Sequence, residues 1–520
     1  MELVACLNRL HPSRLAALPA DVARPRHDRA ALHAGIVHIG IGAFQRAHLA
    51  VVNEAALHAT GDLRWGTVGV SLRQPDTRDA LMPQAGLYTL AIRDAAPDGT
   101  PRETLQVVGN LLDVLVAPED PCAALERVAH PHTRIVSLTV TEKGYHHHPA
   151  TGTLRLNDAD ITHDLANPGA PRTAVGFIVH ALRLRMQRAL PPVTLLSCDN
   201  LPANGDTLRG LVLTFAEQID PALRDWIASR CTFPNSMVDR IVPRTTGADR
   251  ERVSTRLGLQ DAWPVVAEPF LEWVVEDRFA NGRPAWDEGG ARFVEHAEPF
   301  ERLKLRMVNG SHSALAYLGT MAGWRTVDQA IAVPALRDYL DTLMRDEIAP
   351  TLPALVGLDL NDYRARLLLR FANPALQHQT AQIAMDGSQK LPQRLLGTIR
   401  DRLAANASIT QLALAVAAWI HYLRGVDELG APYAIHDPLA AALAEQLARA
   451  DAAGSVRDGI ALFTAFTPVF ANLGNEPRFV DAVAHHALAL KQRGVLATLV
   501  GLRRFGPRRH GAGDEPAAFS

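Results

Sequence analysis

The periodicity of the apolar residues changes near residue 295 of this 520-residue chain. Before that point, short apolar runs bounded by Gly, Pro or Asp alternate with segments of helical period. Beyond it, the pattern is almost wholly helical. Because strands that alternate with helices form a parallel sheet covered by helices, we expect an α/β N-terminal domain and a mostly α-helical C-terminal domain.

The first domain contains short runs with the length and composition of buried strands. The run 134–141 is nearly continuous in apolar residues, as in a parallel strand that is buried on both faces. A helix is predicted over 173–188, because its apolar residues fall on one face. The runs expected to form strands are 36–39, 66–72, 87–92, 105–108, 134–141 and 193–197.

Four segments of the second half have the clearest helical period. The dipeptide Asp437-Pro438 predicts the start of a helix, with the aspartate as N-cap and the proline in the first turn. The predicted helices are 335–347, 409–424, 438–450 and 477–493.

These patterns divide the chain into five parts. The start of the chain is rich in Pro, Arg and Ala and is expected to be a surface extension, whereas the Gly-, Pro- and charge-rich end is expected to be disordered. The parts are an extension at 1–33, an α/β domain at 34–225, a mixed connecting segment packed on it at 226–295, a helical domain at 296–505 and a tail at 506–520.

The charge balance and the cysteine content exclude several classes of protein. Lys plus Arg number 53 and Asp plus Glu 55, which argues against a nucleic-acid partner because such binders carry a basic excess. The four cysteines are scattered without a CxxC pair, so we expect no disulfide framework and a cytoplasmic location. The uncharged stretch 403–423 contains five polar side chains and predicts a buried helix rather than a membrane span.

A possible nucleotide site lies where the strand predicted at 36–39 runs into Gly40-Ile41-Gly42 and a helix is predicted to follow. Two glycines let the backbone turn tightly and approach the pyrophosphate of a dinucleotide, whose charge then lies at the helix N-terminus. The third glycine of the usual pattern is replaced by Gln45. A plain strand-to-helix turn is therefore an equally good interpretation of these residues alone.

The acidic residue that would bind the adenosine ribose does not stand directly at the end of the second predicted strand. Asp76 is the first carboxylate after the second predicted strand and is the candidate for this role, although an ordinary turn aspartate explains it equally well. Asp76 favours NAD, whereas Arg73 could accept the 2′-phosphate of NADP, so the choice between the two cofactors stays open.

The segment from Glu301 to His312 holds the highest density of chemically active side chains. On a regular α-helix at about 100° per residue, Asn309 lies about 140° and His312 about 80° around from Lys304, so the three can face one cavity. A lysine can act as a general base when burial or a neighbouring cation lowers its pKa from about 10.4. An amide can stabilise an alkoxide, and a histidine can orient the same oxygen. Without further context, such residues are more often surface side chains and a helix cap.

Four motifs occur in order along the chain: Gly40-x-Gly42-x-Phe44-x-Arg46-x-His48, Ser197-Cys198-Asp199-Asn200, Phe233-Pro234-Asn235-Ser236-Met237-Val238-Asp239-Arg240 and Lys304-x4-Asn309-x2-His312. Together they resemble the mannitol dehydrogenase family of long-chain, zinc-independent polyol dehydrogenases and reductases. The resemblance runs from about residue 35 to 500. It implies a Rossmann-type N-terminal domain, a helical C-terminal domain, an active site in the cleft between them, NAD as cofactor and no metal. The family also lacks the third glycine.

The resemblance implies a role for each motif residue. Lys304 is the expected general base and His312 the group that orients the reacting oxygen. Asn200 and Asn309 are the expected oxyanion donors, and Asp239 is an expected substrate contact. The acids that match a proton path are Glu142 and Glu301, and the expected cofactor contacts are Ile39, Gly40, Gly42, Ala43, Phe44, Arg46 and Asp76.

The block 386–394, together with Gln382, resembles the fructuronate reductase branch of this family, whose members interconvert D-fructuronate and D-mannonate. A uronate carries a carboxylate that an alditol lacks, so a cation is needed near one end of the substrate. Lys390 and Arg394 are the candidates, although both could be surface cations of a helix. The alternatives are a mannitol 2-dehydrogenase or another polyol dehydrogenase and, more remotely, a non-catalytic sensor of sugar acids or nucleotides.

The expected partner is a small-molecule sugar acid or polyol, with no nucleic acid and no membrane, and the resemblance is consistent with a monomer. His146-His147-His148 has no carboxylate or thiolate beside it in the sequence, so we expect an exposed loop and no metal site. Cys198 has no evident activating histidine and is expected to be a buried thiol.

Overall fold

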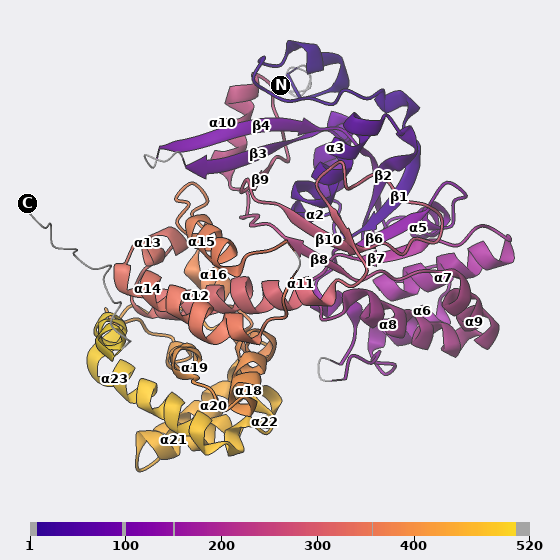
Figure 1. Ribbon diagram of the computed structural model, residues 1–520. Coiled ribbons are helices and arrows are strands. Elements are labelled where there is room, and N and C mark those ends of the chain that lie inside the picture. Colours follow the sequence, from indigo (N-terminus) through magenta and orange to yellow (C-terminus); the bar gives the residue numbers. More distant parts are fainter. Residues whose placement is uncertain (1–7, 96–99, 149–150, 356, 506–520) are drawn as a thin grey trace, which may run out of the picture. The chain divides into compact units, whose positions relative to one another are not determined.

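The computed structural model describes residues 8–95, 100–148, 151–355 and 357–505 (Figure 1). Contacts between residues divide the chain into two compact units. Unit 1 comprises Met1–Glu301 with Pro374–Leu376, and unit 2 comprises Arg302–Asn373 with Gln377–Ser520. The tail expected at 506–520 lies outside the described residues.

Unit 1 combines strands and helices that alternate along the chain. Its strands are β1 (Ala34–Ile39), β2 (Gly66–Ser71), β3 (Tyr88–Ala95), β4 (Pro101–Val108), β5 (Leu111–Val116), β6 (Ile135–Leu138), β7 (Thr194–Ser197), β8 (Ser236–Asp239), β9 (Val265–Ala267), β10 (Glu272–Glu276) and β11 (Arg292–Val294). Its α-helices are α2 (Ala43–Ala47), α3 (Leu49–Thr60), α4 (Asp76–Leu81), α5 (Pro121–Val128), α6 (Ala159–Ala166), α7 (Ala174–Gln187), α8 (Asn204–Ile219), α9 (Pro221–Arg230) and α10 (Gly247–Leu257). Short 3-10 turns are η1 (Pro12–Ala17), η2 (Arg29–Ala31), η3 (Leu63–Trp65), η4 (Met82–Gln84) and η5 (Glu142–Tyr145).

A parallel sheet with the strand order β5-β2-β1-β6-β7 forms the centre of unit 1. Alternate residues of a strand point to opposite faces of a sheet, and here different helices bury the two faces. In β1, Val37 and Ile39 pack on the side of α7 and α8, whereas Ile36 packs on the side of α3. Parallel strands with helices on both faces are the Rossmann-type arrangement, so this prediction is confirmed.

Two of the expected strands lie outside this sheet. The residues predicted at 87–92 and 105–108 belong to the antiparallel hairpin β3–β4, which pairs with β9 in a separate sheet. Their connection is too short for a crossover, because parallel neighbours need a dozen or more linking residues. The edge of the parallel sheet is instead β5, which is absent from the sequence prediction. A third sheet has the order β11-β10-β8.

The segment expected to be a surface extension packs into unit 1. Leu10, Leu18 and Val22 are at most 5% exposed and share a core with residues of β3, β4 and α10. Ala23 also forms a parallel bridge with Gln106 of β4. Residues 8–33 therefore form part of the folded unit, because their few spaced apolar side chains are enough to bind them to the hairpin.

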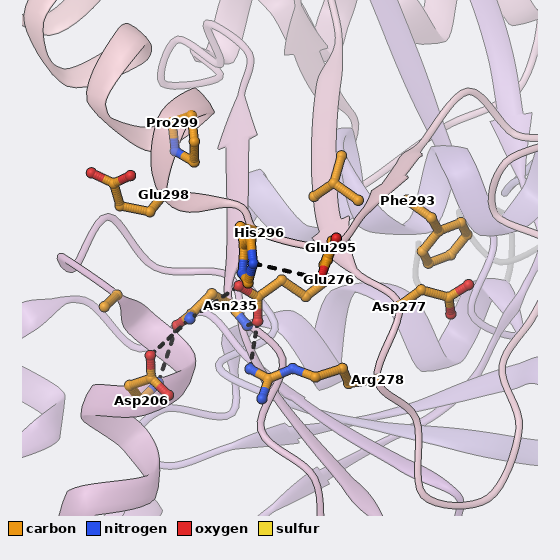
Figure 2. Close-up of a pocket in the computed structure, with 12 residues that line it drawn as sticks. Asp206, Asn235, Glu276, Asp277, Arg278, Phe293, Glu295, His296, Glu298 and Pro299 are labelled. Carbon is orange, nitrogen blue, oxygen red and sulfur yellow. Dashed lines mark hydrogen bonds and ion pairs between the residues drawn. The ribbon is translucent and has the colours of Figure 1, made fainter. Parts of the chain in front are cut away.

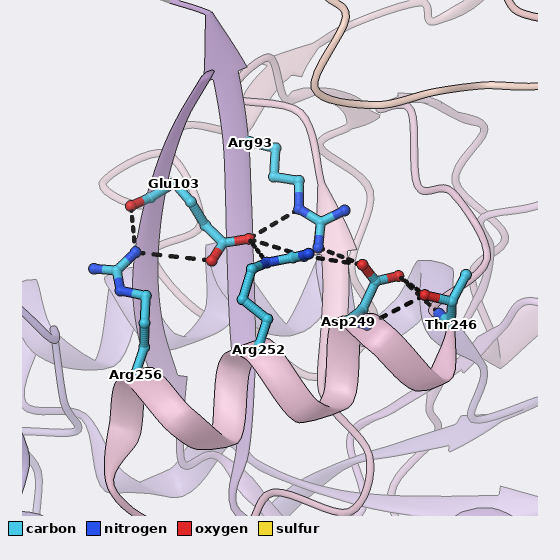
Figure 3. A network of polar contacts seen from close by, with 6 residues as sticks. All are labelled: Arg93, Glu103, Thr246, Asp249, Arg252 and Arg256. Carbon is cyan, nitrogen blue, oxygen red and sulfur yellow. Dashed lines mark hydrogen bonds and ion pairs between the residues drawn. The ribbon is translucent and has the colours of Figure 1, made fainter. Parts of the chain in front are cut away.

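A network of ion pairs joins the hairpin to α10 (Figure 3). Glu103 of β4 lies 2.9 Å from Arg93 of β3 and 3.3 Å from Arg252 of α10. Arg93 also reaches Asp249, in the first turn of α10, at 2.6 Å. A connected network of half-buried charges stabilises a fold more than isolated surface pairs do, so these contacts hold the second sheet against the helix.

Unit 2 is built from helices. α11 (Glu298–Leu303) crosses the boundary between the units and leads into η6 (Lys304–Gly310), a π-helix. The further elements are α12 (Ser311–Met321), α13 (Val327–Ile331), α14 (Pro334–Thr342), η7 (Leu343–Ile348), η8 (Ala349–Thr351), α15 (Leu360–Phe371), α16 (Thr380–Ala384), α17 (Gly387–Leu391), η9 (Pro392–Leu396), α18 (Gly397–Ala404), α19 (Thr410–Tyr422), α20 (Ala440–Asp451), α21 (Val456–Thr464), α22 (Thr467–Phe470), η10 (Leu473–Asn475) and α23 (Pro477–Phe505).

The helix α12 is buried along its whole length and forms the centre of unit 2. It packs against α16 and α19. α19 is the uncharged stretch predicted as a buried helix, and its residues from Leu412 to Trp419 are closed to solvent. The mostly helical second domain is therefore confirmed. Within the described ranges, none of the helices combines the length with the apolar character that a membrane crossing requires.

The helix ends differ from the sequence prediction at two points. α20 begins at Ala440, two residues later than predicted, although the Asp437 carboxylate does accept a capping hydrogen bond from the backbone N–H of Leu439 and another from that of Ser388. The last helix continues beyond the predicted 493, across a kink at Gly494 with a φ of 74°. Only glycine adopts this φ without strain, so the kink depends on it.

Candidate active site

The predicted phosphate turn has the geometry that its glycines suggested. β1 ends at Ile39, and Gly40 has a φ of 92°, where a side chain would be strained and a Cβ would overlap the carbonyl oxygen of Thr139. Gly42 is the N-cap of α2, and a Cβ there would meet no atom closer than the Gly40 carbonyl oxygen at 3.8 Å. Gly40 is thus required by the fold, whereas Gly42 leaves open space at the start of a helix, where a phosphate could approach.

The side chains around this turn divide into those that face outward and those that support it. Ile39 is fully buried in the core and can offer only its backbone. Arg46 is also buried: its guanidinium donates to the carbonyl oxygen of Trp263 at 2.5 Å and lies over the ring of Tyr88. Ala43 and half-buried Phe44 remain at the surface of the turn. The Arg46 side chain therefore supports the turn from behind.

The two candidates for contacts with the ribose lie beyond the next strand. β2 pairs with β1 in parallel, so both strands end at the same edge of the sheet. Asp76 is the first residue of α4, five positions after β2 ends at Ser71, and its side chain is exposed. Arg73 is exposed as well. Both side chains are free to meet a ligand at this edge.

A half-buried carboxylate, that of Asp199, organises the ends of β6 and β7. Asp199 accepts hydrogen bonds from the backbone N–H of Val140 at 3.0 Å, from that of Thr141 at 2.9 Å and from the hydroxyl of Tyr145 at 2.8 Å. Burial raises the pKa of Asp199 to about 6, and the nearby Glu142 charge acts in the same direction. The sequence prediction contained Asp199 only as part of a motif, and no periodicity indicated this function.

These contacts position two predicted site residues in unit 1. Asn200 directly follows Asp199 at the end of β7 and is exposed, and exposed Glu142 follows β6. Glu301 is brought to the same region, because its carboxylate accepts a hydrogen bond from the backbone N–H of Ala203 at 3.0 Å. Three residues predicted to act on the reacting oxygen or its proton thus belong to one set of strand ends and the turn after β7.

Asp239 is the last residue of β8 and is buried. The next residue, Arg240, donates to the carbonyl oxygens of Glu268 and Ala47 and fixes the chain beyond the strand. Burial lowers the pKa of this guanidinium to about 10, which is still far above neutrality. The structure thus gives Asp239 a rigid backbone.

An acidic cavity of about 1090 Å³ lies on unit 1 beside this region (Figure 2). Asn235 joins two of its walls, because its amide donates to Asp206 at 2.9 Å and to Glu276 at 3.3 Å. Ala203, which binds Glu301, also lines the cavity. The carboxylates in its lining are Asp206, Glu276, Asp277, Glu295 and Glu298. No sequence motif predicted this cavity, because its walls come from segments almost a hundred residues apart.

In unit 2, Lys304 begins a π-helix that the sequence prediction did not contain. In a π-helix the backbone hydrogen bonds join residue i to residue i+5. Asn309 therefore lies about one turn from Lys304. The separation of about 140° expected for a regular α-helix is therefore wrong, and the wider turn brings the two residues closer to one face. Lys304 is 7% exposed and Asn309 is half-buried. Such π-helical turns occur often at functional sites.

His312 lies in α12, just beyond this turn, and is held between aromatic rings. Its ring centroid is 4.8 Å from that of Phe371 in a stacked arrangement and 5.3 Å from that of His378. Burial lowers the pKa of His312 well below its usual 6.5, and the charges of His378, Arg394, Arg370 and Lys390 act in the same direction. The imidazole is therefore neutral at neutral pH. Its Nε2 is buried and has no hydrogen-bond partner in the structure.

The cations that surround His312 come from different elements of unit 2. Arg370 belongs to α15, Lys390 to α17 and Arg394 to η9. Arg394 donates to the hydroxyl of Ser313 at 3.1 Å, and Lys390 donates to the carbonyl oxygen of Ile383 at 3.3 Å. The charges of Lys390 and Arg394 thus act on His312, together with those of Arg370 and His378, whereas the sequence analysis expected the two cations near one end of the substrate and made no link between them and His312.

The structure also shows the contacts of His146 and Cys198, for which the sequence analysis expected no function. His146 does have carboxylates nearby, contrary to expectation: its Nδ1 lies 3.0 Å from Asp158, and Asp160 is close. The fold supplies them, because the α6 N-terminus returns to this loop. Asp158 is also paired with Arg155 at 3.0 Å, so an ion-pair cluster explains the arrangement. Cys198 is buried, which raises the pKa of its thiol and leaves it unreactive.

Comparison with known proteins identifies the class of this fold and site. Residues 34–288 match the Mannitol dehydrogenase Rossmann domain, and residues 296–491 match the Mannitol dehydrogenase C-terminal domain. The chain therefore belongs to the mannitol dehydrogenase family of oxidoreductases.

The names of individual relatives denote different activities. The chain is 44% identical over 485 residues to a D-mannonate oxidoreductase of Escherichia coli, covering 92% of this chain and 98% of that protein. It is 41% identical over 438 residues to mannitol dehydrogenase 2 of Saccharomyces cerevisiae, covering 84% and 86% of the two chains. Among solved structures, it matches mannitol 2-dehydrogenase of Pseudomonas fluorescens in ternary complex with NAD and D-mannitol. That match has a TM-score of 0.87 and 38% identity and covers 96% of this chain and 100% of the other.

Proposed function

We propose that this protein is an NAD-dependent oxidoreductase that interconverts D-fructuronate and D-mannonate. The observation that carries the proposal is the group of cations around His312, formed by Arg370, Lys390 and Arg394. A uronate brings one carboxylate to such surroundings, whereas mannitol and fructose bring no charge. A charge-assisted hydrogen bond contributes roughly 1.5–3 kcal/mol, so the group favours the acid. The 44% identity to a D-mannonate oxidoreductase supports the same choice.

In this proposal, four side chains bind the reacting oxygen or exchange its proton. Lys304 takes the proton of the substrate hydroxyl in the direction of oxidation and returns it in reduction. The neutral imidazole of His312 forms a hydrogen bond with the same oxygen through its unpartnered Nε2. The amides of Asn200 and Asn309 donate to this oxygen as negative charge develops on it, and Asp239 binds a substrate hydroxyl. An intact set of this kind favours an enzyme over a non-catalytic sensor.

The proton then travels between Lys304 and solvent through Glu301 and Glu142. Glu301 precedes Lys304 by three residues and is held by the Ala203 N–H, so its carboxylate has a fixed position. The exposure of Glu142 suits a group that exchanges protons with water.

The residues of unit 1 fit a dinucleotide. NAD, when bound, accepts a hydride from the substrate carbon or delivers one to the carbonyl. The open space at Gly42 and the exposed Asp76 are suited to its pyrophosphate and adenosine ribose, and Arg73 is the residue that would meet the 2′-phosphate of NADP. We assign cofactor binding to residues 34–225 with the connecting segment 226–295, and substrate binding to 296–505. The proposed cofactor contacts are the backbone of Ile39 together with Gly40, Gly42, Ala43, Phe44 and Asp76, whereas buried Arg46 is proposed to support the turn from behind and not to touch the cofactor.

A charge-removal experiment tests the substrate. Lys390→Met and Arg370→Met should each raise the KM for fructuronate about tenfold to a hundredfold, because only the acid loses a charge-assisted bond. The KM for fructose should change by no more than about twofold. Lys491→Met, at an exposed position of α23, is the matched control and should leave both values unchanged. Equal losses for the acid and the neutral ketose would contradict the proposed contact with the carboxylate.

The second candidate function is the oxidation of D-mannitol to D-fructose. The match to the mannitol 2-dehydrogenase of Pseudomonas fluorescens favours it, because that structure contains D-mannitol and aligns over nearly all of this chain. The two candidates share the base, the cofactor and the oxyanion donors, and they differ in whether the substrate carries a carboxylate.

A further inference from the structure

We propose that His27, Glu54 and His58 bind a Zn²⁺ ion that fastens the N-terminal segment to α3. One ligand atom from each residue lies within 4.8 Å of the other two. Glu54 and His58 are four residues apart on α3 and therefore share one face of the helix. His27 comes from the loop before η2 and completes the group from another segment of chain. This site is separate from the residues proposed for cofactor and substrate.

The distances suit ligands of a tetrahedral ion. Glu54 Oε1 lies 3.5 Å from His27 Nδ1 and 3.2 Å from His58 Nε2. Zinc bonds to nitrogen and oxygen of about 2.0–2.1 Å place two tetrahedral ligands about 3.3 Å apart. The distance between Glu54 Oε1 and His27 Nδ1 is longer than that of a normal hydrogen bond. The three residues are thus spaced as ligands around a common centre.

Unpartnered polar atoms point to the same conclusion. The His27 side chain is 2% exposed and that of Glu54 is closed to solvent. No hydrogen bond of regular geometry reaches either ring nitrogen of His27 or the Oε1 atom of Glu54, although the backbone of Gly109 lies near the His27 ring. Buried polar groups without partners cost roughly 1–3 kcal/mol each, so native proteins rarely retain them. A metal ion would satisfy His27 Nδ1 and Glu54 Oε1 together.

The orientation of the carboxylate and the types of ligand are also suitable. The second oxygen of Glu54 accepts hydrogen bonds from the N–H of Gly109 at 3.1 Å and the amide of Asn110 at 2.9 Å, which fixes the carboxylate with Oε1 toward the histidines. Two imidazoles and one carboxylate form a zinc ligand set, whereas Mg²⁺ and Ca²⁺ prefer oxygen ligands alone.

Two neighbouring groups bear on this site. The N–H of Arg26 donates to His58 Nε2 at 3.1 Å, and this bond has to give way when the nitrogen binds a metal. Arg29 also lies near His27, but its guanidinium donates to the carbonyl oxygens of Gly109, Ala85 and Leu111 and is thereby held in place. The side chain of His58 is 22% exposed and provides access from solvent.

The test uses the full-length protein, stripped with a chelator, desalted and titrated with ZnCl₂. Wild type should retain one zinc ion per chain by elemental analysis, and its Tm should rise by an amount on the order of 5 °C at saturating zinc. Cobalt in place of zinc should give the visible absorption of a tetrahedral site. Glu54→Gln and His58→Gln should each weaken zinc binding by roughly a hundredfold or more, beyond the loss caused by an outer-shell partner.

His132→Gln is the matched control, because His132 is exposed and belongs to another histidine cluster, with His33 and His130. It should bind zinc like wild type. If Glu54→Gln does not fold, His58→Gln decides, since the partly exposed side chain of His58 can be replaced without a buried cavity. Absence of zinc from titrated wild type, or equal binding by wild type and folded His58→Gln, would overturn the proposal and leave a plain cluster of one carboxylate and two imidazoles.

Discussion

The imidazole of His312 stacks on the phenyl ring of Phe371, with the ring centroids 4.8 Å apart and the planes inclined by 20°. His378 meets the same imidazole edge-on. These contacts fix the plane of the ring, and its burial keeps it neutral. His312 thus presents a rigid, uncharged nitrogen among cations, which suits a group that orients a substrate oxygen without competing for the negative charge of the substrate.

Lys304→Ala should lower turnover by a factor of about 10² to 10⁴, the range for the loss of a general base. Folding and NADH binding should stay near normal, because the substitution only shortens a side chain in the second unit. Steady-state kinetics and NADH titration measure both effects, with Lys491→Ala as the control at an exposed position. A variant that keeps more than a tenth of wild-type turnover would exclude Lys304 as the base.

The two glycines of the phosphate turn should respond differently to alanine. Gly40→Ala places a methyl group against the Thr139 carbonyl at a positive φ and should reduce stability by roughly 1–3 kcal/mol. Gly42→Ala has room within the protein and should keep its Tm, yet it should weaken NADH binding about tenfold or more, because the methyl group occupies space proposed for the pyrophosphate. Thermal unfolding and fluorescence titration separate the effects. Unchanged NADH affinity in Gly42→Ala would remove this turn from the proposed site.

The stability of the protein should fall in mild acid, in part through His486. Burial holds the pKa of His486 at about 4, with the His485 charge acting in the same direction. The unfolded chain, with the usual value near 6.5, binds more protons in this range, so the free energy of unfolding decreases by roughly 1.4 kcal/mol per pH unit as the pH drops from about 6.5 to 4. His486→Gln should remove this contribution, whereas exposed His485→Gln should retain it. Urea unfolding of wild type and both variants at pH 7 and pH 5 measures this difference. If the free energy of unfolding of His486→Gln depends on pH as that of wild type does, the prediction is contradicted.

The sequence predicted most of the fold because local patterns determine it. Alternating strands and helices before residue 295 and a helical period after it were sufficient for the parallel sheet and the second domain. The hairpin β3–β4 was assigned to the wrong kind of sheet, because each strand alone has the same composition as a parallel one. The packing of residues 8–33 depends on contacts with distant strands, which a single segment cannot reveal.

The candidate site was predicted by motif, and its geometry was not. A π-helical turn changes the spacing of Lys304 and Asn309, and no residue type marks such a turn in advance. Arg370 and His378 reach His312 only because separate segments of unit 2 fold against α12. Tertiary contacts of this kind connect residues more than fifty positions apart.

The measurement that tests the central claim most directly is the kcat/KM of wild-type protein for D-fructuronate and for D-fructose, at the same saturating NADH concentration. The cations around His312 predict a preference for fructuronate of about tenfold or more, the factor expected from a single charge-assisted bond. Equal values, or mannitol oxidised as fast as mannonate in the reverse direction, would contradict the uronate assignment and establish the protein as a polyol dehydrogenase.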